Sequence, residues 1–428
     1  MTKRAVHTIA VLTIAILLGF LMLLLVYLIP QSKLDVNVET SLPVLQAEHG
    51  GTTAMALMPE TEQDFFTDAI MVNTCYTVRG SLIEQVLLCQ GYWWGAPADE
   101  LADYFYADSA RRDEMELHIY GRYWHGYQIF LRPMLTVFHI NQIRMLVLMA
   151  QTILGIGIIY LLCKVKKDKL IVPVVVLWLL LIPIITLINL TYAAVMLTTE
   201  LAMIFLLWEK WHNRSLSDKL FFLMEVNGIC IGYFDLLTYP SVAFAAPMIL
   251  FYCLDAEQRV SLKKRVSQFL QGGIAWALGY GGMFLGKWGL ATMLTNENII
   301  KDGVETFLFR SSGEWKGEKI GFFEVLQTNI GYYNTAVYKI LLLAAGVVFL
   351  LLLRKSKLNI QPDICIGVLL SMLVPFGWYF LVRNHSMIHA FFTFRTFSPF
   401  LFGVLILPYQ SLLDGDEEGF LQASERKG

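Results

Sequence analysis

The residues best suited to chemistry lie in one short segment, RNHSMIHAFFTFR at 383–395, between two apolar runs. It holds Arg383, His385, His389 and Arg395 within thirteen residues, interleaved with phenylalanines. Polar groups are costly at the edge of a bilayer, so they are usually kept for a ligand. Arginine and histidine donate hydrogen bonds to phosphate oxygens. The segment predicts a phosphate-binding site at the outer membrane surface, with an aromatic belt and ordinary loop charges as the alternative.

A second candidate is the acidic pair in EQDFFTDAIMVN. Asp64 and Asp68 are four residues apart, so on a helix both would face one direction. A carboxylate held near a substrate can remove the proton of an attacking hydroxyl or amine as a general base. The pair therefore predicts a catalytic base, and the alternative is an ordinary acidic helix face.

Charged residues also interrupt the apolar runs. Glu200 falls near the middle of one run, and Asp235 and Lys287 fall at the outer ends of two others. Ionisable residues within spans are usually functional or paired. We expect Lys287 at the depth of the 383–395 segment as a phosphate ligand, and Asp235, Glu200 and Arg310 as substrate contacts. Glu200 has a structural alternative, as a polar partner between helices.

The composition defines the elements that must position these residues. Hydrophobic residues make up 56% of the 428, charged residues 16%, and the mean hydropathy is +0.55. Soluble proteins average about 25% charged residues. Apolar stretches long enough to cross a bilayer recur along the chain. The sequence predicts an all-α polytopic membrane protein with about ten transmembrane helices, at 8–29, 145–163, 170–190, 192–208, 221–237, 242–254, 269–288, 336–353, 364–382 and 391–409.

Positive charge predicts the orientation. With ten spans, every Lys- and Arg-rich loop falls on one side, which places both termini in the cytoplasm of a multi-pass plasma-membrane protein. Residues 31–142 and 289–335 are then outer loops of a transmembrane domain covering 1–410, and 411–428 form a cytoplasmic tail. The first loop is rich in aromatic residues, which predicts helices lying in the membrane interface. A net charge of −2 argues against a nucleic-acid partner.

Other signatures are absent or ambiguous. The sequence has no nucleotide-binding, HExxH or CxxC motif. His385 and His389 have a spacing that suits zinc on a helix, but no third ligand is evident, so we predict no metal and no cofactor. Cys75 and Cys89 both fall in the first outer loop, where a disulfide and two free thiols remain equally open.

The arrangement resembles the GT-C glycosyltransferases, polytopic enzymes that use a polyprenyl-phosphate-linked sugar at the outer face of the membrane. The resemblance rests on the whole architecture and on EQDFFTDAIMVN, the Lys287–Trp288 pair and RNHSMIHAFFTFR. It implies an inverting transferase in which Asp68 or Asp64 is the base. It further implies that Lys287, His385, His389 and Arg395, with Arg383, hold the donor phosphate.

The resemblance also limits the acceptor. The chain has no large soluble C-terminal domain and no WWD motif, since residues 93–97 read WWGAP. This favours transfer of one sugar to a cell-envelope glycan or lipid over transfer of an oligosaccharide to protein. Two other classes remain open, a transporter or flippase for a lipid-linked glycan and a non-catalytic assembly protein.

Overall fold

The computed structural model describes residues 3–48, 64–181, 189–256, 259–354 and 356–412. These residues are almost entirely helical, which confirms the all-α fold class. Six of the described helical stretches are long and apolar enough to cross a membrane. They coincide with six of the ten expected spans: Arg4–Tyr27, Ile140–Lys164, Leu190–Trp211, Ala336–Leu353, Pro362–Leu381 and Ala390–Gln410.

The other four expected spans stay predictions. Helix α9 (Ile171–Leu181) reaches the edge of the described residues, and α12 (Ser241–Leu254) has only 14 residues. Helices α11 (Leu216–Phe234) and α13 (Leu262–Leu294) are long enough, but their charged and glycine residues lower the mean hydropathy. The count of ten spans therefore depends on four helices that are short or less apolar and that obtain part of their apolar surroundings from neighbouring helices.

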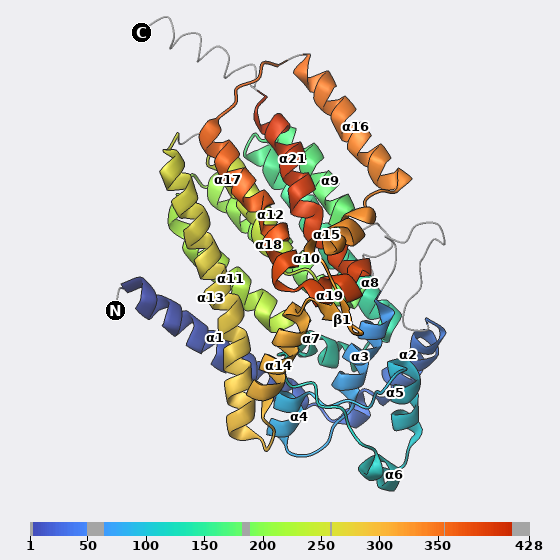
Figure 1. Ribbon diagram of the computed structural model, residues 1–428. Coiled ribbons are helices and arrows are strands. Elements are labelled where there is room, and N and C mark those ends of the chain that lie inside the picture. The colour runs from blue at the N-terminus through green and yellow to red at the C-terminus, as the bar shows by residue number, and fades with distance from the viewer. Residues whose placement is uncertain (1–2, 49–63, 182–188, 257–258, 355, 413–428) are drawn as a thin grey trace, which may run out of the picture.

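The helices form a bundle around α12, whose residues are all buried (Figure 1). Helix α10 (Leu190–Trp211) packs on α12 and on α8 (Ile140–Lys164), and α13 packs along α11. Glycines allow the last pair to approach closely, because a Cβ at Gly228 would lie 2.2 Å from the carbonyl oxygen of Trp276. The outward faces of α1 (Lys3–Tyr27) and α16 (Ala336–Leu353) are apolar, as lipid contact requires.

The chain between α1 and α8 folds into short helices at one end of the bundle (Figure 1). Their shared core is a cluster of buried apolar residues from several of these helices. Buried Arg132 ties the cluster to the end of α1 by donating to the carbonyls of Val26, Ile29 and Cys75. The helices are α2 (Asp35–Ala47), α3 (Phe65–Tyr76), α4 (Leu82–Leu88), α5 (Pro97–Tyr106), α6 (Ser109–Glu114) and α7 (Gln128–Leu135).

The remaining elements precede and follow α16 in the chain. After α13 come α14 (Ile299–Ser311), the hairpin of β1 (Glu314–Trp315) and β2 (Glu318–Lys319), and α15 (Phe322–Gly331). The 383–395 segment folds as α19 (Arg383–Ile388), α20 (Ala390–Thr393) and the start of a 3₁₀ turn (Phe394–Phe397). It lies between α18 (Val374–Leu381) and α21 (Ser398–Gln410), with α17 (Pro362–Met372) preceding them.

The two cysteines left open by the sequence are buried free thiols in the structure, with no disulfide between them. The Cys89 sulfur accepts a hydrogen bond from the Gln128 amide at 3.2 Å. A small, weakly polar thiol is an ordinary occupant of such a core.

The orientation can be tested by thiol labelling. In a Cys163→Ser background, which removes the exposed native cysteine, Glu318→Cys should react with an impermeant thiol reagent added outside intact cells. Ser356→Cys should react only after permeabilisation. Glu318 is exposed in the β hairpin and Ser356 follows α16, on the side where the sequence places basic loops. Reversed labelling would contradict the predicted topology.

Candidate functional site

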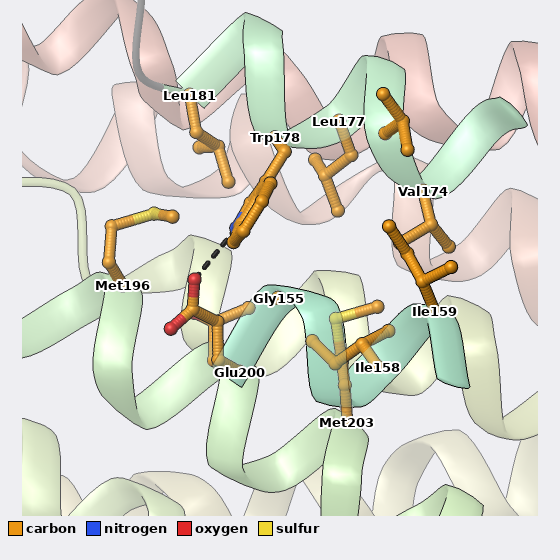
Figure 2. A pocket seen from close by; sticks show the side chains of 12 residues that line it. Gly155, Ile158, Ile159, Val174, Leu177, Trp178, Leu181, Met196, Glu200 and Met203 are labelled. Carbon is orange, nitrogen blue, oxygen red and sulfur yellow. Dashed lines mark hydrogen bonds between the residues drawn. The ribbon is translucent and has the colours of Figure 1, made fainter. Parts of the chain in front are cut away.

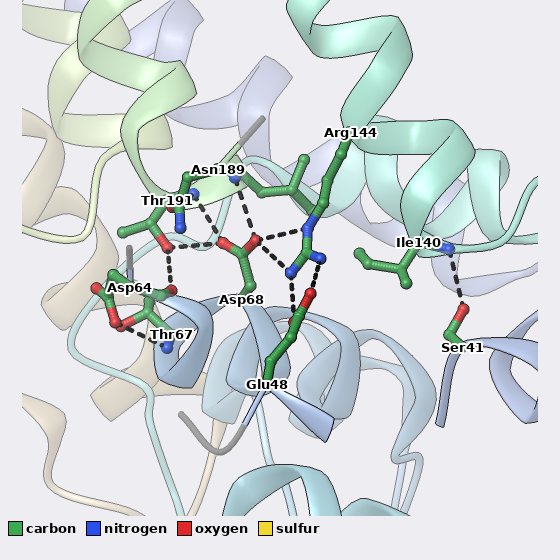
Figure 3. Close-up of polar contacts among 10 residues, drawn as sticks. Ser41, Glu48, Asp64, Thr67, Asp68, Ile140, Arg144, Asn189 and Thr191 are labelled. Atoms are coloured by element: carbon green, nitrogen blue, oxygen red, sulfur yellow. Dashed lines mark hydrogen bonds and ion pairs between the residues drawn. The ribbon is translucent and has the colours of Figure 1, made fainter. Parts of the chain in front are cut away.

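Asp68 is the centre of a buried polar hub that joins three helices (Figure 3). Its Oδ2 accepts from Nε and Nη2 of Arg144 on α8, at 3.1 and 3.0 Å. Its Oδ1 accepts from the hydroxyl and backbone N–H of Thr191 on α10, at 2.9 and 3.0 Å. The same arginine also binds Glu48 at 2.5 and 3.0 Å. The lone pairs of Asp68 are therefore committed to positioning α3 against α8 and α10.

Asp64 has different surroundings. It is the N-cap of α3, and its Oδ1 accepts from the backbone N–H of Thr67 at 3.0 Å (Figure 3). Its backbone carbonyl lies 3.4 Å from the Thr191 hydroxyl, so the Asp68 hub also fixes Asp64. Asp64 is therefore a cap residue rather than a residue within the helix, and both aspartates contact Thr191, Asp64 through its backbone and Asp68 through its carboxylate.

Tyr120 lies within electrostatic range of Asp64 and of two arginines. Burial, and then the neighbouring Tyr123, raise the pKa of Tyr120 to about 12. Arg122 and Arg310 act against this shift in the pKa, and Asp64 adds to it. Electrostatic effects of this kind extend over several ångströms and do not require contact.

Arg310 and two histidines form the basic part of the site. Nη1 of Arg310 lies 2.9 Å from Nε2 of His389, and since a guanidinium only donates, this nitrogen accepts and His389 is neutral. His385 donates from Nε2 to the carbonyl of Leu237 at 2.7 Å, and its ring lies 4.7 Å from that of His389. Burial first, then the nearby Arg310, lowers the pKa of His389 to about 4. Burial, His389 and Arg310 also lower the pKa of His385.

Several buried polar atoms around these residues have no hydrogen-bond partner among the described residues. Such atoms are uncommon in native proteins and call for an explanation. They come from the end of α14, from α19, from the start of α10 and from the turn after α11. They are Nε of Arg310, Oγ of Ser311, Nε of Arg383, Oδ1 of Asn384, Nδ1 of His385, Oγ of Ser386, Oη of Tyr192, Oη of Tyr239 and Oγ of Ser241.

Arg395 closes the site on the side of α10. Its guanidinium lies 4.6 Å from the ring centre of Tyr192 and donates to the carbonyls of Leu181 and Phe391. Tyr192 lies within electrostatic range of Asp64 and Arg395. Its ring is 6.3 Å from that of Phe392, which stacks on His389 at 5.2 Å. We call the group Asp64, Tyr120, Tyr192, Arg310, His385, His389, Phe392 and Arg395 the Asp64 site.

The other predicted site residues have partners elsewhere. Lys287 donates to the carbonyl of Val86 at 3.0 Å and lies 5.4 Å from a ring of Trp124. Asp235 accepts from the backbone and hydroxyl of Thr238, at 3.0 and 2.5 Å. Arg383 lies over the ring of Phe380 at 5.4 Å, at the edge of the unpartnered group. None of these contacts joins Lys287 or Asp235 directly to the histidines.

Glu200 lines an apolar pocket between α8, α9 and α10 (Figure 2). One carboxyl oxygen accepts from the indole N–H of Trp178 at 2.7 Å, and the other has no partner in the described part of the chain. The structural alternative considered for Glu200, a polar bond between helices, thus accounts for one of its two oxygens.

Sequence reasoning missed Tyr120, Tyr192, Arg144 and Thr191. Tyrosines in an aromatic-rich chain carry no local signal, and Arg144 is placed near Asp68 only by tertiary packing. A signal for Arg144 was available, because an arginine one turn into an apolar run needs a carboxylate partner.

The fold and site together define a helical membrane protein with a buried, charged polar site at one end of its bundle. Comparison with known protein families, curated proteins and solved structures found no match to this chain. In the described part of the chain, no three His, Cys, Asp or Glu side chains gather as a metal site.

The histidines give the fold a pH dependence. The pKa of His389 is about 4 in the folded protein and about 6.5 when unfolded. The unfolded chain therefore binds more protons as pH falls from about 6.5 to 4, and stability falls over that window. We expect the melting temperature to drop more steeply over this range in the native protein than in His389→Gln, which keeps an acceptor for Arg310 but does not titrate. Parallel curves would contradict the assignment.

Proposed function

We propose that the protein is a GT-C-like glycosyltransferase that moves a sugar from a polyprenyl-phosphate donor to a glycan or lipid acceptor at the outer face of the plasma membrane. One observation carries the proposal. Asp64 and Arg310 both lie within electrostatic range of Tyr120, and Arg310 contacts His389 in a region where buried donors and acceptors lack partners among the described residues. An oxyanion needs such donors, and an attacking hydroxyl needs such a base.

The proposed reaction is one displacement at the anomeric carbon. The acceptor oxygen forms a bond to this carbon while the bond to the phosphate oxygen breaks, and the bonding electrons leave with the phosphate. Asp64 takes the acceptor proton. Arg310 and Arg395 stabilise the charge that builds on the phosphate. The N–H of His385 donates to the carbonyl of Leu237, so its other ring nitrogen is an acceptor. Attack opposite the leaving group inverts the anomeric centre.

Within this proposal, Asp64 is the base and Asp68 is a positioning residue. Asp68 accepts five hydrogen bonds, from Arg144, Thr191 and the N–H of Leu190, so a proton would have to displace one of them. The hydrogen bonds of Asp68 hold the start of α3 beside α10. They thereby fix the position of the Asp64 backbone and the orientation of its side chain.

The phosphate-binding part predicts specific losses of affinity. We expect Arg310→Ala to weaken binding of a polyprenyl-phosphate sugar about ten- to a hundredfold, because a charge-assisted hydrogen bond is worth roughly 1.5–3 kcal/mol. Arg395→Ala should do the same, and Arg395→Lys should recover only part, because lysine lacks the planar fork. The measurement is donor affinity of the purified protein, with the melting temperature as folding control.

The matched control is Arg111→Ala, which removes an exposed arginine from α6 and should leave affinity unchanged. Unchanged affinity in Arg310→Ala and Arg395→Ala, with both proteins folded, would contradict the phosphate site and leave the 383–395 segment as an interfacial anchor.

A further inference from the structure

A row of aromatic and planar side chains leads away from the Asp64 site along an extended segment. Gly91 and His118 exchange two backbone hydrogen bonds, at 3.1 and 2.8 Å, and the N–H of Tyr120 donates to the carbonyl of Leu88 at 2.9 Å. Alternate residues of an extended chain point to the same face. His118 and Tyr120 therefore project together, while Ile119 packs into the core behind them. Arg122 lies in the turn that follows, and its guanidinium lies over the Tyr120 ring.

The row is continuous from the exterior to Tyr120. The ring of Trp94 lies 5.6 Å from that of His118, and the ring of Trp93 lies 4.8 Å from His118 and 5.6 Å from Tyr120. The Arg122 guanidinium lies 4.6 Å from the centre of the Tyr120 ring. Asp64 lies within electrostatic range of Tyr120.

Trp94 is exposed yet firmly held. The exposed fraction of Trp94 is 58%. One oxygen of Glu100 accepts from the backbone N–H groups of Trp94, Gly95 and Ala96, at 2.6, 3.2 and 3.2 Å. The indole N–H donates to the carbonyl of Glu116 at 3.2 Å. A side chain that is already fixed in orientation loses little conformational entropy when a ligand binds, so the ligand binds it more tightly.

Two polar atoms beside the row are buried without a hydrogen-bond partner among the described residues. Nε of Arg122 has no hydrogen-bond partner within the described residues, and its terminal nitrogen makes only a long contact of 3.5 Å to Asp302. Oε1 of Gln90, next to the Gly91 bridge, also lacks a partner there. A row of ring faces flanked by a fork-shaped donor and an amide is complementary to a ligand with apolar C–H faces and hydroxyl edges.

We propose that this row is the acceptor subsite and that its ligand is a carbohydrate, so the acceptor is a glycan and not a lipid. The inference rests on the proposed function, because it places the acceptor hydroxyl next to Asp64. A pyranose C–H face lies on the exposed Trp94 indole, since the ring face is electron-rich. Arg122, whose side chain is 19% exposed, bonds a hydroxyl. A bilayer is the poorer occupant, because the Glu100 carboxylate lies directly against the backbone of Trp94.

The test measures glycan binding without any donor. Purified full-length protein in nanodiscs is titrated with a panel of fluorescent tetrasaccharides of glucose, mannose, galactose and N-acetylglucosamine. We expect at least one to bind, with affinity lowered about tenfold or more in Trp94→Ala and in Arg122→Gln. Trp208→Ala, which removes another exposed tryptophan from α10, is the matched control and should bind normally.

The outcomes separate this inference from the proposed function. Absence of binding to every tetrasaccharide, or binding that Trp94→Ala and Arg122→Gln leave unchanged, overturns the subsite even where the protein transfers sugar. Weaker attachment of Trp94→Ala to lipid vesicles, with glycan binding intact, also overturns it in favour of a membrane contact. Glycan binding that depends on Trp94 supports the subsite, even where no transfer from any donor is found.

Discussion

We expect Asp64→Asn to lower the rate of sugar transfer by about a hundred- to ten-thousandfold, the range that a general base contributes. The amide cannot accept the proton of the acceptor hydroxyl. Asparagine is as good an N-cap as aspartate, so the bond to the N–H of Thr67 and the start of α3 should survive. The loss should therefore appear in turnover, with the melting temperature nearly unchanged.

Asp108→Asn is the matched control for this substitution. Asp108 caps α6 as Asp64 caps α3, accepting from the N–H of Arg111 at 2.9 Å, but it is exposed and carries no proposed role. It should keep full activity. Full activity in Asp64→Asn would remove the base from the proposed mechanism.

Asp68→Asn should instead act first on stability. The substitution leaves the buried Arg144 with one carboxylate partner, Glu48, in place of two. It also replaces one carboxylate oxygen of residue 68, which accepts hydrogen bonds, by an NH₂ group, which can only donate them. Removing one member of a buried ion pair typically costs about 3–5 kcal/mol. We expect a clearly lower melting temperature and lower activity that follows the folded fraction.

A double substitution tests this reading of Asp68. Because Asp68 and Arg144 contact each other directly, Asp68→Asn with Arg144→Gln should destabilise the protein less than the sum of the two single changes. An Asp68→Asn protein as stable as the native one but without activity would contradict the positioning role and make Asp68 the base.

Much of the fold could be predicted from local composition. Long apolar runs such as 8–29, which is uncharged, and 336–353, which contains Lys339, specify spanning helices by themselves, since the bilayer dictates their length and polarity. Helix α12 shows the limit of this approach. It has only 14 residues and owes its burial to α10, α17 and α21 around it, so hydropathy alone cannot assign its length across a membrane.

The site was predictable only in part, for the same reason. The 383–395 segment identified Arg395, His385 and His389 because their types are unusual beside a membrane. Their partners are far away in the sequence, as Arg310 is 79 residues from His389. The separate roles of Asp64 and Asp68 depend on where α3 begins and on the position of Arg144 on α8. The spacing of the two aspartates in the sequence predicts neither the start of α3 nor the position of Arg144.

The most direct test of the proposed function is transfer by the purified protein itself. The full chain in nanodiscs would be given a panel of polyprenyl-phosphate sugars, each radiolabelled in the sugar, together with the tetrasaccharide acceptors, and Asp64→Asn would be run in parallel. We predict that label from at least one donor appears on a glycan, with inverted anomeric configuration, and that Asp64→Asn forms almost none. Movement of intact labelled donor across the bilayer, with no label on any acceptor, would contradict a glycosyltransferase and identify a transporter.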